Sequence, residues 1–132
     1  MSKRKSISAP DIPEHKNPIP AATRIGDLVF SSAVGGEDPD SHELPEDSES
    51  QIANVFKTIR AIMREADGSP DNIARLSVYL ADMEDRKLVN PHWLEMFPDE
   101  PSRPVRHTTA KKLPPGRKIQ VEFRAFYELE VA

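Results

Sequence analysis

The sequence contains no cysteine, and this absence excludes several kinds of structure and chemistry. The chain cannot form a disulfide framework, a thiolate nucleophile, or a cysteine-ligated zinc or iron–sulfur centre. Long apolar runs are also lacking, since a membrane-spanning helix needs roughly 20 such residues. No apolar stretch follows the basic residues near the N-terminus, as a secretory signal would require. We therefore expect a cytoplasmic protein without a membrane span.

An excess of basic residues is lacking as well. The chain has 18 Lys and Arg against 22 Asp and Glu, a formal net charge of −4 at pH 7. Nucleic-acid binders usually carry a basic domain, so DNA or RNA binding is disfavoured. The 132 residues fit one compact domain. Hydrophobic residues make up 37% and recur in periodic clusters, which excludes wholesale disorder.

Proline, by contrast, is abundant. The chain has 13 prolines, about twice the usual share, and they divide it into segments. Residues 1–17 contain almost no apolar residue and carry the cluster Lys3-Arg4-Lys5, so we predict a flexible or loosely docked N-terminal arm. The cluster is short for a nuclear or anionic-surface signal, and a solvated tail is the simpler interpretation. Residues 18–132 then form a single domain.

Hydrophobic periodicity and turn residues predict the secondary structure. The expected elements are, in chain order, a hairpin over 21–34, a helix beginning at Ser48, a strand over 72–81, a helix over 83–97, and strands over 105–112 and 118–131. Gly26 and Asp27 supply the hairpin turn. Gly68 is suited to a left-handed cap that ends the first helix, and Pro70 cannot continue it. Pro91 is expected to kink or restart the second helix.

The same periods predict which side chains face the core. The first helix carries one apolar stripe, formed by Ile52, Val55, Phe56, Ile59, Ile62, Met63 and Ala66. The inward residues of the strand over 72–81 are expected to be Ala74, Leu76, Val78 and Leu80, and those of the second helix Leu88, Trp93, Leu94 and Phe97. The order of elements predicts an α+β fold with two helices on one face of a mixed sheet. The other face would be wet in a monomer, so we expect an oligomer to cover it.

Most familiar catalytic patterns are not present. His15, His42, His92 and His107 fall in different predicted elements without the spacing of metal ligands, so no metal site is expected. The glycines form neither a P-loop nor a dinucleotide fingerprint, and no serine lies in a G-x-S-x-G elbow. The sequence therefore gives no reason to expect a cofactor.

One segment is unusual on physical grounds. PSRPVRHTT, residues 101–109, places Arg103 and Arg106 at the start of a strand, between prolines that restrict the backbone. An arginine held in this way can bind a carboxylate through two parallel hydrogen bonds. The alternative is a solvated basic loop on an acidic protein, and composition alone favours this alternative.

Four segments together resemble the Rid family, the reactive-intermediate (imine and enamine) deaminases, also called YjgF-like proteins and in part described as L-PSP endoribonucleases. They are ATRIGDLVFSSAV, ADGSPDNIARLSVYLADMEDRKLVN, the P-x-R of Pro104-Val105-Arg106, and LPPGRKIQVEF. Their order and spacing extend the resemblance over residues 18–130. The resemblance implies a chorismate-mutase-like α+β fold and a homotrimer with sites in the clefts between subunits.

The resemblance also implies an activity and a set of site residues. Family members hydrolyse small 2-imino or 2-enamino carboxylates to 2-oxo acids and ammonia. Arg106 would bind the substrate carboxylate, and Arg103, which lies in a second P-x-R, stays open as an alternative. Thr108 would hold the substrate or polarise a water through its backbone N–H. Ser32 and Asn90 match further substrate-binding positions.

Two positions depart from the family pattern. Ile19 replaces a tyrosine that faces the substrate, and Gln120 replaces the glutamate that orients the attacking water. An amide can position a water but cannot accept its proton. Glu122 faces the same side of its strand, about 6 to 7 Å further along. Glu122 either takes the place of the missing glutamate, for a ligand that is longer or shifted, or pairs with Arg124 or a neighbouring chain. The alternative function is a non-catalytic binder of small carboxylates; RNA cleavage is a third possibility that no basic track supports.

Overall fold

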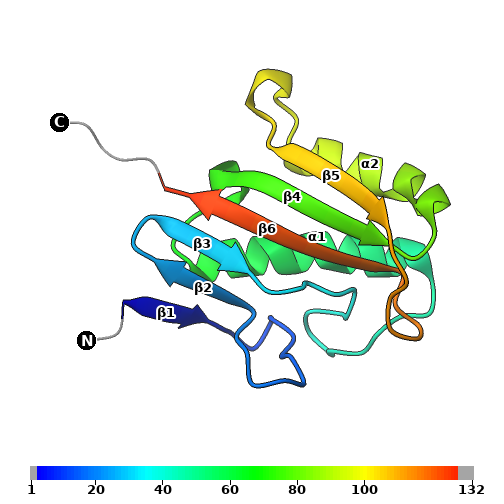
Figure 1. Ribbon diagram of the computed structural model, residues 1–132, viewed down its shortest axis with the longest axis horizontal. Coiled ribbons are helices and arrows are strands. Elements are labelled where there is room, and N and C mark those ends of the chain that lie inside the picture. The colour runs from blue at the N-terminus through cyan, green and yellow to red at the C-terminus, as the bar shows by residue number, and fades with distance from the viewer. Residues whose placement is uncertain (1–2, 128–132) are drawn as a thin grey trace.

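The computed structural model describes residues 3–127, and its six strands form one mixed sheet (Figure 1). The strands are β1 (Arg4–Ile7), β2 (Ala22–Ile25), β3 (Leu28–Ser31), β4 (Ile73–Leu80), β5 (Val105–Ala110) and β6 (Ile119–Phe126). The helices are α1 (Ser48–Glu65) and α2 (Arg86–Met96), with 3-10 turns η1 (Pro70–Asn72), η2 (Met83–Asp85) and η3 (Glu100–Ser102). Within residues 3–127 no helix is both long and apolar enough to cross a membrane.

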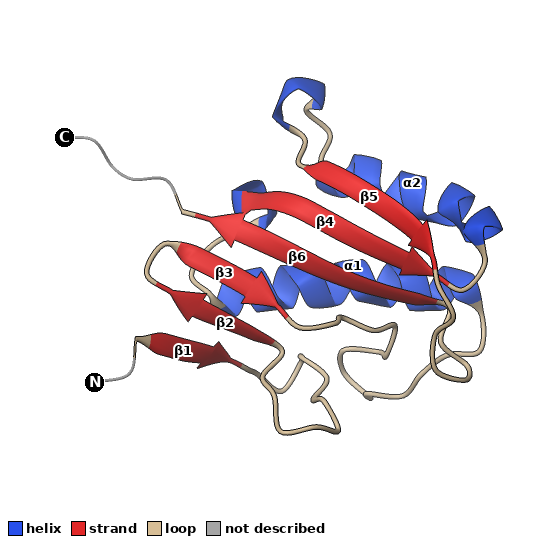
Figure 2. Ribbon diagram, viewed as in Figure 1, coloured by secondary structure: helices blue, strands red, loops and turns tan. Residues whose placement is uncertain are grey.

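The strand order across the sheet is β1-β2-β3-β6-β4-β5. β4 and β5 pair in parallel, and the other neighbours pair antiparallel. α1 connects β3 to β4, and α2 connects β4 to β5. Both helices lie on the same side of the sheet, behind it in Figure 2. The predicted α+β fold, a mixed sheet with two helices on one face, is therefore confirmed.

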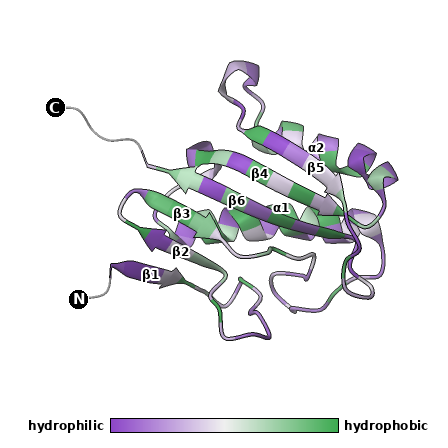
Figure 3. Cartoon of the chain, viewed as in Figure 1, coloured by the Kyte–Doolittle hydropathy of each residue, from purple (hydrophilic) through white to green (hydrophobic). Residues whose placement is uncertain are grey.

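The core lies between α1 and the sheet, as the hydrophobic period predicts. Every residue of the α1 stripe is buried: Ile52, Val55, Phe56, Ile59, Ile62, Met63 and Ala66. β6 contributes alternate residues to the same core, namely Ile119, Val121, Phe123 and Ala125. Figure 3 shows the corresponding alternation of hydrophobic and hydrophilic residues along β4. The predicted strand over 118–131 extends past Tyr127 into residues outside the described part.

β4 follows its predicted pattern except at its start. Three of the predicted inward side chains are buried: Leu76, Val78 and Leu80. Ala74, however, is exposed, and Ile73 is buried in its place. A register shift between Ile73 and Arg75 in the pairing with β6 explains the difference. An extra residue in one strand reverses which side chains face the core.

α2 corrects the sequence prediction at two points. The helix runs through Pro91 from Arg86 to Met96 without a break. Leu94, expected to face inward, is 49% exposed, and Val89 and Met96 are the buried residues of the helix. A restart at Pro91 was therefore wrong. Leu94 is exposed because Val89, Trp93 and Met96, four and three residues apart, share one face of the continuous helix, and Leu94 lies one residue past it.

Within residues 3–17, the N-terminal segment packs on the domain and is not the loose arm that the sequence predicts for residues 1–17. Residues 4–7 form β1, which pairs antiparallel with β2 at the edge of the sheet. Ile7 and Ile12 are each only 2% exposed and belong to the hydrophobic core. Arg64 of α1 donates two hydrogen bonds to the carboxylate of Asp11, which lowers the pKa of Asp11 from its usual value. Two buried isoleucines and this ion pair therefore fix the segment.

The end of α1 also differs from expectation. Asp67, not Gly68, has the left-handed backbone conformation, with φ of 61°. Gly68 donates its backbone N–H to Met63, which closes the last turn. A Cβ on Gly68 would approach the Asn72 side chain to 2.8 Å and the Tyr127 ring to 3.0 Å. Close packing, and not backbone conformation, is what requires glycine here.

Candidate active site

Arg106 faces the helix layer of the molecule. Strand β5 pairs in parallel with β4, and Arg106 lies opposite Leu76 and Thr108 opposite Val78. Leu76 and Val78 are buried towards the helices, so Arg106 and Thr108 share that face of the sheet. β5 is the last strand of the sheet, and its other edge is unpaired within the described residues. The predicted anion site thus lies where β5 meets α2.

Two side chains of α2 hold the Arg106 guanidinium. Nη2 donates a hydrogen bond to Oδ1 of Asn90 at 2.8 Å, and the guanidinium carbon lies 5.0 Å from the centre of the Trp93 ring. This arrangement leaves Nη1, which is buried and has no hydrogen-bond partner within residues 3–127. Burial lowers the pKa of Arg106 from its usual value, and the positive charge of Arg86 lowers it further. An arginine with a buried, unpaired N–H is equipped to bind an anion.

Arg103 has a different position. Its Nε donates a hydrogen bond to the backbone carbonyl of Phe97 at 2.8 Å. Phe97 is the C-cap of α2, where unpaired carbonyls attract a cation. Of the two arginines that the sequence left open, Arg103 is engaged at the helix end through its Nε, and Arg106 is the one with a buried nitrogen that has no hydrogen-bond partner within residues 3–127.

Gln120 and Glu122 lie on the opposite face of the sheet. In the pairing of β6 with β4, Gln120 lies opposite Tyr79 and Glu122 opposite Ser77. These positions alternate with the buried residues of both strands, so they face away from the helices. Within one chain, the structure therefore does not bring Gln120 or Glu122 to Arg106.

A cavity of about 610 Å³ borders Gln120. Its walls come from the N-terminal segment 12–17, the loop after β3, the turn before β6, and α1. Two of the histidines that the sequence separates, His15 and His42, both line it. The floor includes Thr58, whose buried hydroxyl has no hydrogen-bond partner within the described part of the chain. This cavity is larger than the hollow of about 190 Å³ that borders Glu122.

An ion pair forms part of the cavity wall. Arg117 donates from Nη1 and Nη2 to the two carboxylate oxygens of Glu37, at 2.7 and 3.3 Å. Burial alone would raise the pKa of Glu37, but the hydrogen bond and charge of Arg117 outweigh it and hold the pKa below its usual value. The carboxylate therefore stabilises the fold at neutral pH, and this contribution is lost as the pH falls below 4.5 through the lowered pKa.

Glu37→Gln is expected to lower the free energy of unfolding at pH 7 by roughly 1 to 2 kcal/mol, because Arg117 loses its charged acceptor. The difference in free energy of unfolding between the variant and wild type should shrink as the pH falls, since Glu37 of the wild type itself becomes neutral. Urea unfolding at pH 7 and at several values below pH 4.5 measures this. A pH-independent difference would contradict the assigned role of the ion pair.

The remaining predicted residues have local partners. Ser32 donates its hydroxyl to the backbone carbonyl of Pro20 and its N–H to Ala21, both at 2.8 Å. Glu122 borders a smaller hollow of about 190 Å³ on the open face of the sheet, together with Arg75 and Arg124. No ion pair joins Glu122 to Arg124 within residues 3–127.

Sequence reasoning missed Trp93 as a site residue, because its hydrophobic character assigned it to the core. The spacing of Asn90 and Trp93, three residues apart, does place them on the same face of a helix, and this signal could have joined them. Within the described residues, no three His, Asp or Glu side chains gather as metal ligands would.

The chain matches one known protein family in both sequence and fold. Residues 11–127 match the profile of the family described as "Endoribonuclease L-PSP". A RutC family protein of Aquifex aeolicus is 28% identical over 92% of this chain and 98% of its own, and the mouse 2-iminobutanoate/2-iminopropanoate deaminase is 28% identical over 90% and 88%. The crystal structure of RidA from Psychrobacter sp. PAMC 21119 superposes with a TM-score of 0.86 at 27% identity, covering 93% of this chain and 99% of that one. The chain belongs to the Rid (YjgF-like) family, the family of this L-PSP profile.

Proposed function

We propose that this protein hydrolyses small 2-imino or 2-enamino carboxylates to 2-oxo acids and ammonia. The observation that carries the proposal is Arg106, a partly buried arginine with an unpaired Nη1 and no carboxylate partner in the described chain. A substrate carboxylate would occupy that unused donor and pair the charge. The name of the mouse relative, an iminobutanoate and iminopropanoate deaminase, supports the same class of substrate.

The proposed roles follow from the positions around Arg106. Asn90 and Trp93 fix the guanidinium, so little freedom is lost when the anion binds. Thr108 lies two residues further along the same face of an edge strand, where its backbone N–H or hydroxyl can hold the substrate or a water. A water oxygen adds to the imine carbon, and one proton of that water passes to the nitrogen. The C–N bond of this adduct then breaks while the hydroxyl proton passes to the nitrogen, so the hydroxyl oxygen becomes the carbonyl of the 2-oxo acid and the nitrogen leaves as ammonia.

The proposal requires a second copy of the chain. Gln120 faces away from Arg106 within one chain, so a water-positioning Gln120 must come from a neighbouring subunit. The open face of the sheet exposes Phe30, Phe126 and Val105, at 39%, 49% and 63%, as an interface that awaits a partner would. We therefore keep the homotrimer with sites between subunits as part of the proposal, with Ser32 as a support of the cleft wall and Glu122 as the residue that would meet a longer ligand.

The test is imine hydrolysis in solution. An amino-acid oxidase generates 2-iminopropanoate or 2-iminobutanoate, and semicarbazide traps whatever imine survives. Wild-type protein should suppress the trapped product in proportion to its concentration, and heat-denatured protein should not. Unchanged trapping for both substrates would refute the proposed activity.

Gln120 itself favours a second candidate, the non-catalytic binder of small carboxylates, because an amide provides no general base. The two candidates differ in one outcome. A binder would show saturable binding of 2-oxobutanoate that depends on Arg106, with no effect on semicarbazide trapping. A deaminase would show both Arg106-dependent binding of 2-oxobutanoate and suppression of semicarbazide trapping.

Gln120→Glu is expected to add a general base and with it a new pH dependence. The ratio of variant to wild-type kcat/KM should rise about tenfold or more as the pH increases through roughly 4.3, the ordinary pKa of a glutamate. Taking the ratio cancels the pH dependence of the imine. A flat ratio would mean that position 120 does not meet the reacting water.

A further inference from the structure

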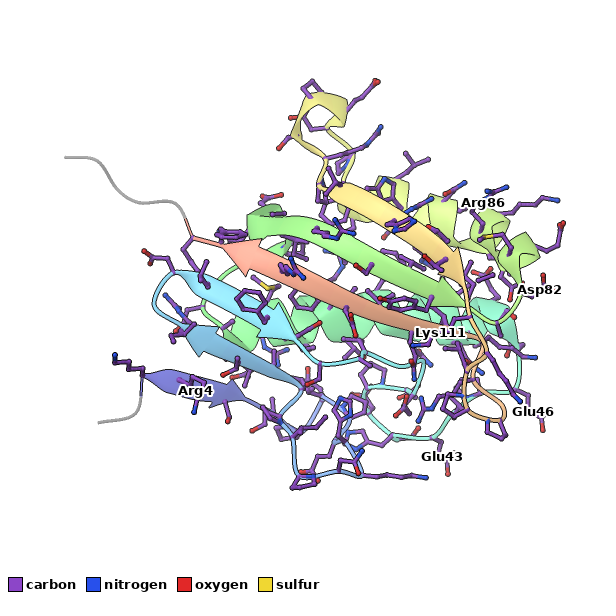
Figure 4. The ribbon with its side chains drawn as sticks, viewed as in Figure 1. Arg4, Glu43, Glu46, Asp82, Arg86 and Lys111 are labelled. Atoms are coloured by element: carbon purple, nitrogen blue, oxygen red, sulfur yellow. The ribbon has the colours of Figure 1, made fainter. Side chains whose placement is uncertain are left out.

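A second arginine, Arg86, lies on the same side of α2 as the two residues that hold Arg106. Arg86, Asn90 and Trp93 are spaced by four and three residues, which places them on one stripe of the helix. Asn90 and Trp93 both contact the Arg106 guanidinium. Side chains four residues apart on a helix have Cβ atoms about 5 to 6 Å apart, so Arg86 is the next side chain along the site. Figure 4 labels Arg86 on α2, the helix that lies behind β5.

The path of the chain shows in which direction the site extends. α2 returns the chain from the end of β4 to the start of the parallel strand β5, so α2 and β5 run in opposite directions. At one end, Arg103 just before β5 contacts Phe97 just after α2. Going backwards along α2, from Trp93 to Arg86, is therefore the same direction in space as going forwards along β5, from Arg106 to Thr108. Arg86 lies beyond Asn90 on the Thr108 side of the site.

Neither Arg86 nor Arg106 has a carboxylate partner within residues 3–127, although other cations of this chain do. Arg64 pairs with Asp11, Arg117 with Glu37, and Lys87 with Glu84. The positive charge of Arg86 acts on Arg106, which is already partly desolvated. The two positive charges repel each other, and the buried N–H of Arg106 has no partner within residues 3–127, so an anion with two charges would stabilise both arginines.

We infer that the site takes a dianionic substrate, a 2-imino dicarboxylate, with Arg106 binding the carboxylate next to the imine carbon and Arg86 binding the distal carboxylate. This inference rests on the proposed function and names its substrate class. The proposed chemistry fixes a carboxylate beside the reacting carbon at Arg106. A second carboxylate then extends past Thr108 to Arg86, where the planar guanidinium suits it.

The experiment compares two stable product acids, 2-oxobutanoate and 2-oxoglutarate, by titration calorimetry at one low ionic strength. Wild type should bind 2-oxoglutarate about fivefold more tightly than 2-oxobutanoate, the upper range for an ion pair with an exposed side chain such as Arg86. Arg86→Gln should remove this preference and leave 2-oxobutanoate binding within about twofold. The matched control is Lys87→Gln, which removes the same charge from a neighbouring exposed residue paired with Glu84, and should keep the preference.

Equal binding of the two acids by wild type, or the same loss of preference in Arg86→Gln and Lys87→Gln, would overturn the inference. In that case Arg106-dependent binding of 2-oxobutanoate and imine hydrolysis would still uphold the proposed function. Absence of any carboxylate binding by wild type would instead overturn the proposed function, and this inference with it.

Discussion

Arg106→Ala is expected to lower kcat/KM for imine hydrolysis about 100-fold or more, and to weaken 2-oxobutanoate binding by a similar factor. Truncating one partner of a partly buried charge pair commonly costs about 2 to 5 kcal/mol, and tenfold in affinity corresponds to about 1.4 kcal/mol. Arg106 carries the buried, unpaired N–H of the site. Asn90 accepts a hydrogen bond from Arg106, so it does not supply a donor that could replace the lost guanidinium. The semicarbazide assay and calorimetry measure the two effects.

Arg103→Ala is the matched control. Arg103 donates to the Phe97 carbonyl at the end of α2, so its loss should cost about 1 kcal/mol of stability and leave carboxylate binding nearly unchanged. Urea unfolding of both variants separates stability from binding. If Arg103→Ala abolished binding and Arg106→Ala kept it, the carboxylate clamp would be assigned to the wrong arginine.

Much of the fold could be predicted because the core elements carry strong periods. The stripe of α1 and the alternation of β6 each assign one face to the core, and both are buried as expected. The N-terminal strand could not be predicted in this way. β1 has the sequence RKSI and is an edge strand that backbone hydrogen bonds to β2 hold in place. Its mostly charged and polar side chains show no alternation from which a strand could be predicted. Ile12 is likewise a single buried residue without a period.

The site was predictable only where its residues are close in sequence. The P-x-R of Arg106 is a local motif: physical reasoning on prolines and guanidinium geometry pointed to the segment with Arg103 and Arg106, and only the family resemblance selected Arg106. The alternation of β6 places Gln120 on the face away from the core, but that Arg106 lies on the opposite face depends on the pairing of β5 with β4, which joins residues far apart in the chain. Glu37 and Arg117 are 80 residues apart, and no spacing rule connects them. Charge alone did not distinguish Arg117 from the other arginines of the chain.

Gly36→Ala is expected to lower the free energy of unfolding by roughly 3 kcal/mol, the largest stability effect among the glycines of this chain. An added Cβ would lie 2.5 Å from Cβ and 2.8 Å from Cα of Gln51 on α1, and backbone atoms of a helix cannot move aside easily. Gln51 is fully buried and donates to the carbonyls of Pro45 and Gly116. Its oxygen accepts from the N–H of Lys118 at 2.8 Å. Displacing Gln51 therefore strains the contacts between α1 and two loops at once.

Gly35→Ala is the comparison that tests this reasoning. Its added Cβ would meet the ends of the Glu37 and Arg117 side chains, which can rotate away, so the cost should be roughly 1 to 2 kcal/mol and should come from the displaced ion pair. In a Glu37→Gln background, Gly35→Ala should then cost less than in wild type, whereas Gly36→Ala should cost the same in both. Urea unfolding at one fixed protein concentration measures all the variants, because assembly makes stability depend on concentration. Equal costs for Gly35→Ala and Gly36→Ala would show that contact with the α1 backbone is not what requires glycine at position 36.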